Sequence, residues 1–320
     1  MERMKNDIKI IFWGTPEFVV PSFEALIRHG YNVVAVVTNP DEPVGRKQIL
    51  TSPPAKVWAE KRDIPVLQPR TLAKYKLPTT NYKPDLFIVA AYGKIIPKEI
   101  LEIPALGALN VHPSLLPHWR GPSPIQYTIL HGDTEAGVTI IKMDEKMDHG
   151  PIIANSKFKI KSSKIKYCEL HNELAKLGAE LLIETLPKWI CGEIKPAPQD
   201  ETRVTYSKIL KKEDGKINWT KPAQTIERQI RAFEGWPGSY TFWQKDEHRL
   251  RLEIEKGEAV ELEMPVGKPG FVWQDNTGSL LVQTGSGSIA AGAIKAEGKK
   301  TLSAVVFLNG HRDIIGQILI

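Results

Sequence analysis

Cysteine is scarce in this 320-residue sequence, which contains only Cys168 and Cys191. Two cysteines are too few for a disulfide framework, and they lack the spacing of a metal site. Their scarcity favours a reducing compartment. Zinc chemistry and thiol chemistry are therefore not expected.

Long hydrophobic runs are also missing near the amino terminus. The first apolar run, Ile8 to Trp13, is far too short for the core of a signal peptide or for a membrane span. We expect this run to form a strand of a cytoplasmic protein that does not bind membranes.

Two motifs of common enzyme classes are absent as well. The first predicted strand leads into WGTPEF (13–18) and not into G-x-G-x-x-G, the motif that binds dinucleotides. The hypothesis of a nicotinamide oxidoreductase therefore loses its main support. No serine or cysteine stands in a recognisable nucleophile elbow. The sequence favours chemistry in which one substrate attacks the other directly.

The composition is that of an ordinary globular protein, with 42% hydrophobic and 25% charged residues. The length of the chain exceeds the range in which one hydrophobic core keeps growing, so we expect two domains. In the first half, short Ile- and Val-rich runs alternate with helical spacing, which indicates an α/β fold with a Rossmann-like, doubly wound, mostly parallel sheet. The predicted strands cover residues 8–13, 32–38, 85–91, 107–111 and 137–143.

The second half has a different pattern. A helix is predicted at 167–190, and the segment from Lys195 is rich in proline, as linkers often are. Beyond it, short strand-like runs separated by Gly, Asp and Asn indicate a small antiparallel barrel or sandwich. We predict a catalytic domain at 1–194, a linker at 195–206 and an all-β domain at 207–320.

Positive charge gathers in the middle of the chain. Residues 151–221 hold 14 Lys and Arg against 9 Asp and Glu, a net charge of +5, whereas residues 222–320 come to −1. Such an excess fits a surface that faces a polyanion, and it equally fits a solvated helix face and linker. Charge alone does not decide between them.

The strongest chemical signal lies in ALNVHPSLLPHWRGPSPIQ (108–126). Residues two apart in a strand share a face, so Asn110 and His112 project together while Val111 enters the core. An isolated histidine would more often cap a turn. Here Pro113 favours ending the strand, and ligands of doubly wound sheets bind beyond the carboxyl ends of the strands.

An aspartate completes the candidate set. Asp148, in KMDEKMDHG (142–150), follows a predicted strand and is expected at the same sheet edge, where it can orient the His112 imidazole. Without a protein nucleophile, the three side chains suit direct acyl or formyl transfer to a substrate amine. Asn110 and His112 would donate hydrogen bonds to the developing oxyanion, and Asp148 would assist His112 and proton transfer.

The same residues carry a family resemblance. NVHPSLLPHWRGPSPIQ, with Asp148 in GVTIIKMDEKMDHG, closely resembles the 10-formyltetrahydrofolate-dependent formyltransferases. IIFWGTPEFVVPSFEAL, TNPDEPVGRKQILTSPPAK, IRAFEGWPGSY and FLNGHRDIIGQIL extend the resemblance over nearly the whole chain. They are most similar to the members that act on methionyl-tRNA.

The resemblance implies roles on the donor side of the reaction. Asn110, His112 and Asp148 would be catalytic, with 10-formyltetrahydrofolate as co-substrate and no metal. Four residues of the turn would line the folate, which would explain exposed leucines there, and backbone groups of two further loops would hold its pterin. The implied folate-binding residues are Ser114, Leu115, Leu116, Pro117, Tyr92, Gly93, Asp144 and Met147.

The resemblance also implies an acceptor, the α-amino group of methionine on initiator tRNA. The loop 39–54 would engage the acceptor end of the tRNA, and the domain from residue 207 would be an oligonucleotide-binding (OB)-like barrel that helps to hold it. A monomer is expected. The implied tRNA-binding residues are Arg46, Lys47, Lys208, Lys211 and Lys212.

Two other functions remain open on the sequence. One is a formyltransferase that acts on a sugar nucleotide or on a purine-pathway amine. The other is a non-catalytic RNA-binding protein that keeps the fold. The role of Arg120 is also undecided, between contacting a ligand and bracing its loop.

Overall fold

The computed structural model describes residues 6–45, 47–73, 75–245, 247–262 and 267–320, and divides into two compact units. The first unit comprises residues up to 124 together with 135–160 and 170–208. The second comprises 125–134, 161–169 and 209–320. In the described part of the chain, no helix is long and apolar enough to cross a membrane.

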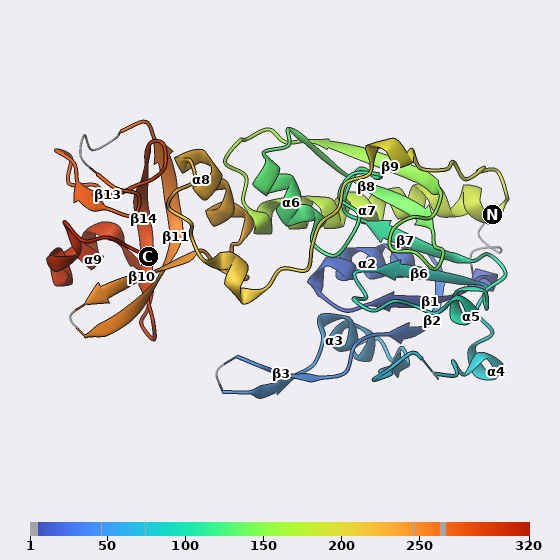
Figure 1. Ribbon diagram of the computed structural model, residues 1–320. Coiled ribbons are helices and arrows are strands. Elements are labelled where there is room, and N and C mark those ends of the chain that lie inside the picture. The colour runs from blue at the N-terminus through green and yellow to red at the C-terminus, as the bar shows by residue number, and fades with distance from the viewer. Residues whose placement is uncertain (1–5, 46, 74, 246, 263–266) are drawn as a thin grey trace. The chain divides into compact units, whose positions relative to one another are not determined.

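The first unit is built on a seven-stranded sheet of order β5-β2-β1-β6-β7-β8-β9 (Figure 1). The pairings from β5 to β7 are parallel, whereas β8 pairs antiparallel with both β7 and β9. The predicted fold class of this half, a mostly parallel Rossmann-like sheet, is confirmed. The strands are β1 (Lys9–Gly14), β2 (Asn32–Val37), β5 (Val66–Leu67), β6 (Leu86–Ala90), β7 (Ala108–His112), β8 (Glu135–Lys142) and β9 (Ile152–Lys159).

Helices pack on the sheet through small and aromatic side chains. Phe12 of β1 contacts Phe23, which stacks on Trp58, and a side chain at Gly178 would collide with Val111 of β7. Val111 therefore faces a helix, and alternation along β7 turns Asn110 and His112 to the opposite face. In the described part of the chain the α-helices are α2 (Val20–Arg28), α3 (Pro54–Glu60), α4 (Thr79–Tyr82), α5 (Lys98–Leu101), α6 (Pro124–His131), α7 (Tyr167–Ile190), α8 (Ala223–Ala232) and α9 (Ala304–Gly310).

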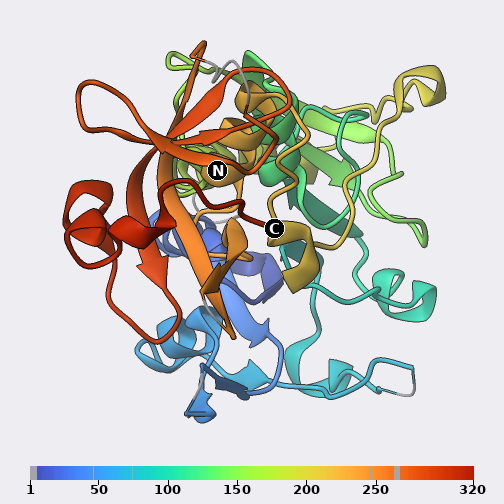
Figure 2. The same ribbon diagram turned by 60° about the vertical axis from the view of Figure 1, so that its left-hand side comes forward.

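The loop 39–54 contains a short hairpin, β3 (Glu42–Val44) paired with β4 (Ile49–Thr51). The hairpin extends away from the seven-stranded sheet (Figures 1 and 2). Its apolar side chains are open to solvent, with Val44, Ile49 and Leu50 between 56% and 67% exposed. Apolar side chains that gather on an exposed surface mark it as a candidate interaction site.

The second unit is an antiparallel barrel that closes on itself. Its sheet has the order β10-β11-β14-β13-β12, with β15 beside β14. The carboxyl-terminal segment bonds to both edges of that sheet: the Ile320 and Phe242 backbones exchange two hydrogen bonds, and the Val272 amide donates to the Gln317 carbonyl. The strands are β10 (Tyr240–Lys245), β11 (His248–Val260), β12 (Val272–Gln274), β13 (Leu280–Gln283), β14 (Ser288–Ala296) and β15 (Leu302–Ser303).

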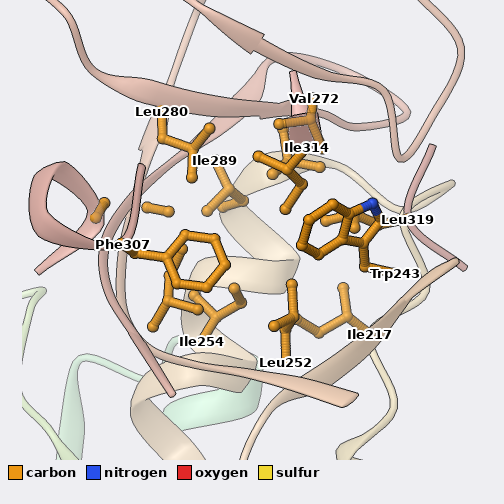
Figure 3. Close-up of a cluster of buried hydrophobic side chains, with 14 of the residues drawn as sticks. Ile217, Trp243, Leu252, Ile254, Val272, Leu280, Ile289, Phe307, Ile314 and Leu319 are labelled. Carbon is orange, nitrogen blue, oxygen red and sulfur yellow. The ribbon is translucent and has the colours of Figure 1, made fainter. Parts of the chain in front are cut away.

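A hydrophobic cluster fills the barrel, as Figure 3 shows. Trp243 lies in it at 1% exposure. We expect Trp243→Ala to lower the free energy of unfolding by about 3–5 kcal/mol, because the substitution removes a large buried side chain and leaves a cavity. A urea titration followed by circular dichroism measures the change. Val305→Ala, at a position 65% exposed in the same unit, is the control and should change stability little.

Candidate active site

The candidate site lies near the carboxyl end of β7. Asn110 and His112 are 8% and 4% exposed. Both point at one carboxylate, that of Asp148. Asn110 Nδ2 donates a hydrogen bond to Asp148 Oδ1 over 3.1 Å, and His112 Nδ1 lies 3.5 Å from the same oxygen. The structure therefore brings the three side chains together at one point.

The second oxygen of the carboxylate is held by the backbone. Asp148 Oδ2 accepts a hydrogen bond of 2.8 Å from the Gly121 amide. Its two oxygens thus accept from Asn110 and Gly121, while the His112 ring lies beside the first. An ionised carboxylate is acceptor-only and suits both donors. The site consequently requires an acid at position 148.

The other ring nitrogen of His112 is engaged as well. His112 Nε2 lies 3.0 Å from the carbonyl oxygen of Trp119. A carbonyl oxygen can only accept, so Nε2 must carry a hydrogen. At 3.5 Å the Nδ1 contact with Asp148 is too long for a strong hydrogen bond. Nδ1 is therefore the ring atom that remains able to contact a ligand, and it donates to a ligand oxygen when the ring carries hydrogens on both nitrogens.

Asp148 reaches the site by a route that the sequence did not predict. Because β8 runs antiparallel to β7, the loop after it begins at the opposite edge, where the Met143 amide bonds to the Ala108 carbonyl. Within this loop, Asp148 accepts the hydrogen bond from Asn110. The expected route, a strand that ends at the same sheet edge, is wrong, but Asp148 does lie beside Asn110 and His112 as expected.

Comparison with known proteins identifies the family. A model of the formyl transferase family matches residues 8–186, and a model of the formyl transferase carboxyl-terminal domain matches residues 209–312. The chain belongs to the formyl transferase family. It is an enzyme of formyl transfer, with both domains that these models describe.

Relatives match this formyltransferase over nearly its whole length. A methionyl-tRNA formyltransferase of Chloroflexus aurantiacus is 42% identical, with 96% of this chain and 99% of the relative covered. That of Myxococcus xanthus is 41% identical, with 95% of each chain covered.

Solved structures share the fold at lower identity. An N-formyltransferase from Helicobacter canadensis, solved with folinic acid and dTDP-3-aminofucose, is 19% identical with a TM-score of 0.61 over 89% of this chain and 99% of that one. HypX from Aquifex aeolicus, solved with tetrahydrofolic acid, is also 19% identical, with a TM-score of 0.62 over 93% of this chain. The match spans 46% of HypX.

The turn expected to line the folate is more buried than its sequence suggests. Ser114 and Leu116 are 2% and 7% exposed, and Leu115 is half-buried, so the expectation of exposed leucines is wrong. Pro117 is also buried. Thr139 explains the burial: its hydroxyl donates to the Ser114 carbonyl over 2.7 Å and accepts from the Leu116 amide over 3.1 Å. The turn is thereby fastened to β8.

The other expected folate-binding residues have diverse surroundings. Tyr92 is 2% exposed and its ring packs edge-on against Trp13, while burial raises the pKa of its hydroxyl to about 12. Gly93, the next residue, is exposed. Asp144 binds His149 over 2.6 Å, and Met147 is 54% exposed. Of these side chains, Met147 is therefore the most open to a ligand.

The basic residues expected at the tRNA are all on the surface where they are described. Lys47, Lys208, Lys211 and Lys212 are exposed. Arg46 lies outside the described residues. In the described part of the chain, no group of three or more His, Cys, Asp or Glu is placed to hold a metal ion.

The sequence did not predict the backbone groups that contact the catalytic side chains, or the side chain that holds the backbone of Asp148. Trp119 and Gly121 act through a backbone carbonyl and a backbone amide, so their side chains do not announce these roles. Gln199 donates to the Asp148 carbonyl from a position 51 residues away, inside the segment predicted as a linker. Only the folded chain reveals that contact.

Proposed function

We propose that this formyltransferase moves the formyl group of 10-formyltetrahydrofolate to the α-amino group of methionine esterified to initiator tRNA. The observation that carries the proposal is the convergence of Asn110, His112 and Asp148 in a chain whose methionyl-tRNA formyltransferase relatives align end to end. We assign catalysis to residues 1–194, the connection to 195–206 and tRNA binding to 207–320. The enzyme acts as a cytoplasmic monomer.

The first step forms a carbon–nitrogen bond. The methionine amine attacks the formyl carbon, and the carbonyl oxygen takes the negative charge. Asn110 Nδ2 uses one hydrogen for Asp148 and has a second for this oxygen. His112, when hydrogens are on both ring nitrogens, keeps Nε2 on the Trp119 carbonyl and supplies the other hydrogen bond to this oxygen from Nδ1. Donors aimed at a developing oxyanion are among the largest contributions to catalysis.

The second step breaks the bond between the formyl carbon and N10 of the folate. The attacking nitrogen must lose a proton, and N10 must gain one. Asp148 is the base nearest to both donors and accepts the proton from the amine. The proton then passes to N10, so the net reaction releases tetrahydrofolate and formyl-methionyl-tRNA.

The donor is bound next to this set. Met147 offers an exposed apolar side chain on the loop that carries Asp148, and Gly93 offers exposed backbone. Leu115 stands half-buried on the turn, where it can still contact an apolar ring. Ligand sites of this kind combine apolar walls with a few polar groups that fix orientation.

The acceptor tRNA meets two exposed surfaces. The hairpin β3–β4, with Lys47 and the apolar Val44, Ile49 and Leu50, contacts the acceptor end together with Arg46. Lys208, Lys211 and Lys212 contact the phosphate backbone. Charge near the middle of the chain supports this assignment, because phosphate contacts supply most of the non-specific affinity for nucleic acids.

An acceptor comparison tests the proposal. The enzyme and 10-formyltetrahydrofolate are incubated with methionyl-initiator tRNA, with methionyl-elongator tRNA or with an amino-sugar nucleotide, and the formylated products are measured by mass spectrometry. The proposal predicts formylation of the initiator tRNA in clear preference to the others. Preferential formylation of the amino sugar would assign the enzyme to the other acceptor class.

Binding of tRNA should depend strongly on salt. The logarithm of the association constant should fall linearly with the logarithm of salt concentration. Replacing Lys208, Lys211 and Lys212 together by alanine should reduce that slope by about 2–3 units. Filter binding at several salt concentrations measures it. A variant with alanine at the exposed Lys61, Lys176 and Lys188 is the charge-matched control. An equal change of slope in both triple variants would contradict the assignment of Lys208, Lys211 and Lys212 to tRNA binding.

A further inference from the structure

Arg120 is a buried cation whose partners all lie on one later segment. Its side chain is 2% exposed. Its guanidinium donates to Gln199 Oε1 over 2.9 and 3.0 Å and to the Glu201 carboxylate over 2.6 and 3.3 Å. These hydrogen bonds hold the pKa of the Glu201 carboxyl below its usual range. A buried charge with this many partners fixes their positions as well as its own.

The segment 199–207, which we call the strap, also binds the backbone beside the site. The Trp119 amide donates to the Thr205 hydroxyl over 2.9 Å, and the Arg120 amide donates to the Thr205 carbonyl over 2.9 Å. The Ser207 amide returns a bond to the Arg120 carbonyl. Residues 119–121 supply the carbonyl that binds His112 and the amide that binds Asp148. The strap thus holds the groups that hold the catalytic side chains.

Gln199 has only one possible orientation of its amide. Its oxygen faces two guanidinium hydrogens, so its nitrogen must face the other way. There Nε2 donates 2.8 Å hydrogen bonds to the carbonyls of both Asp148 and Gly150. With the amide reversed, hydrogens would face hydrogens at Arg120 and oxygens would face oxygens at the loop. Arg120 therefore sets which end of Gln199 meets Asp148.

Asp148 needs such a partner because of its backbone conformation. Its φ is 49°, in the left-handed region, which costs an L-residue about 1–2 kcal/mol. The Gln199 amide holds the Asp148 carbonyl, and Gly121 and Asn110 hold its carboxylate. The residue is fixed at both ends, so the direction of its carboxylate toward His112 is fixed too.

We propose that Gln199 is a positioning residue for Asp148, and that Arg120 acts by orienting the Gln199 amide. The proposal rests on formyl transfer by Asn110, His112 and Asp148. It gives the strap, which is predicted from sequence only as a linker, a direct part in the geometry of the reaction.

Gln199→Met tests the proposal, because it keeps the length of the side chain and removes both amide groups. We expect kcat for formyl transfer to fall by about tenfold to a hundredfold, as small misplacements of catalytic groups do, with KM for both substrates nearly unchanged. Gln199→Glu is the second variant: it keeps the acceptor for Arg120 and loses only the donors to Asp148 and Gly150. It should show a similar loss.

Asp200→Asn is the matched control on the same strap. It removes one charge from an exposed side chain that bonds Thr202 and leaves the contacts of Gln199 and Arg120 in place, so kcat should stay within about twofold of wild type. Thermal unfolding of each variant shows whether the fold persists. A kcat near the wild-type value in a folded Gln199→Glu or Gln199→Met variant would overturn the proposal.

Hydrogen exchange separates this proposal from the proposed function. In Gln199→Met the Gly121 amide, which is bonded to Asp148, should exchange faster than in wild type or in Asp200→Asn. If the wild-type enzyme formylated none of the acceptors, the proposed function would fail while this exchange measurement still decided the role of Gln199. Equal exchange at Gly121 in all three proteins would contradict the positioning role.

Discussion

Replacing His112 by alanine is expected to lower kcat for formyl transfer by about 10³-fold or more. The substitution removes the oxyanion donor Nδ1 and the ring that stands beside the Asp148 carboxylate. It also frees the Trp119 carbonyl, which accepts from Nε2. Single-turnover formylation with enzyme in excess over tRNA measures a loss of this size directly.

The fold should survive the loss of His112. The Asp148 carboxylate keeps its hydrogen bonds from Asn110 and Gly121, so the loop that carries it stays attached. Binding of tetrahydrofolate and the thermal unfolding temperature should therefore remain close to those of wild type. Near wild-type turnover at saturating substrates would mean that His112 does not take part in the reaction.

Replacing Asp148 by asparagine is expected to lower kcat by about 10²–10⁴-fold, the range usual for loss of an acid–base group. Asparagine has almost the same shape as aspartate, but one of its ends is a donor. At position 148 that end would face either the Gly121 amide or Asn110, both of which are donors. The variant therefore loses the base and also misorients the site. Asp148→Ala should be at least as inactive.

Glu145→Gln is the matched control for Asp148→Asn. It removes one negative charge from an exposed position on the same loop, without a contact to Asn110, His112 or Gly121 among the hydrogen bonds described. Its turnover should be close to wild type. A similar loss in both variants would show that the overall charge of the loop matters, and not the carboxylate of Asp148.

Much of the fold was predictable because it depends on local patterns. The apolar runs at 8–13, 32–38 and 85–91 became β1, β2 and β6 within one or two residues, and the leucine stripe at 167–190 became α7. Alternation along β7 also predicted that Asn110 and His112 share a face. These features follow from side-chain periodicity, which a sequence carries in full.

Features that depend on distant partners were not predictable. β9 was missed because it is a sheet edge with only one of its eight residues buried, so its apolar signal is weak. The apolar run of β8 does not reveal its direction, which is antiparallel to β7 in the folded sheet. This direction decides where the loop to Asp148 begins.

The candidate site shows the same division. Asn110 and His112 could be predicted from a short motif, and Asp148 from a nearby loop. Gln199 and Thr139 act across long separations and carry no motif of their own. The burial of Leu116 likewise depends on Thr139, which lies 23 residues further along the chain. Such contacts belong to tertiary structure and appear only once the chain has folded.

Direct transfer between the two substrates is the central claim, and one measurement tests it. Wild-type enzyme, in excess over a formyl donor labelled in its formyl group, is mixed with methionyl-initiator tRNA and sampled by rapid quench. The account predicts that the label passes from the folate to the methionine amine in one step, with none on the protein, and that His112→Ala stops this transfer. Label on the protein before it reaches the tRNA, or rapid transfer by His112→Ala, would contradict the account.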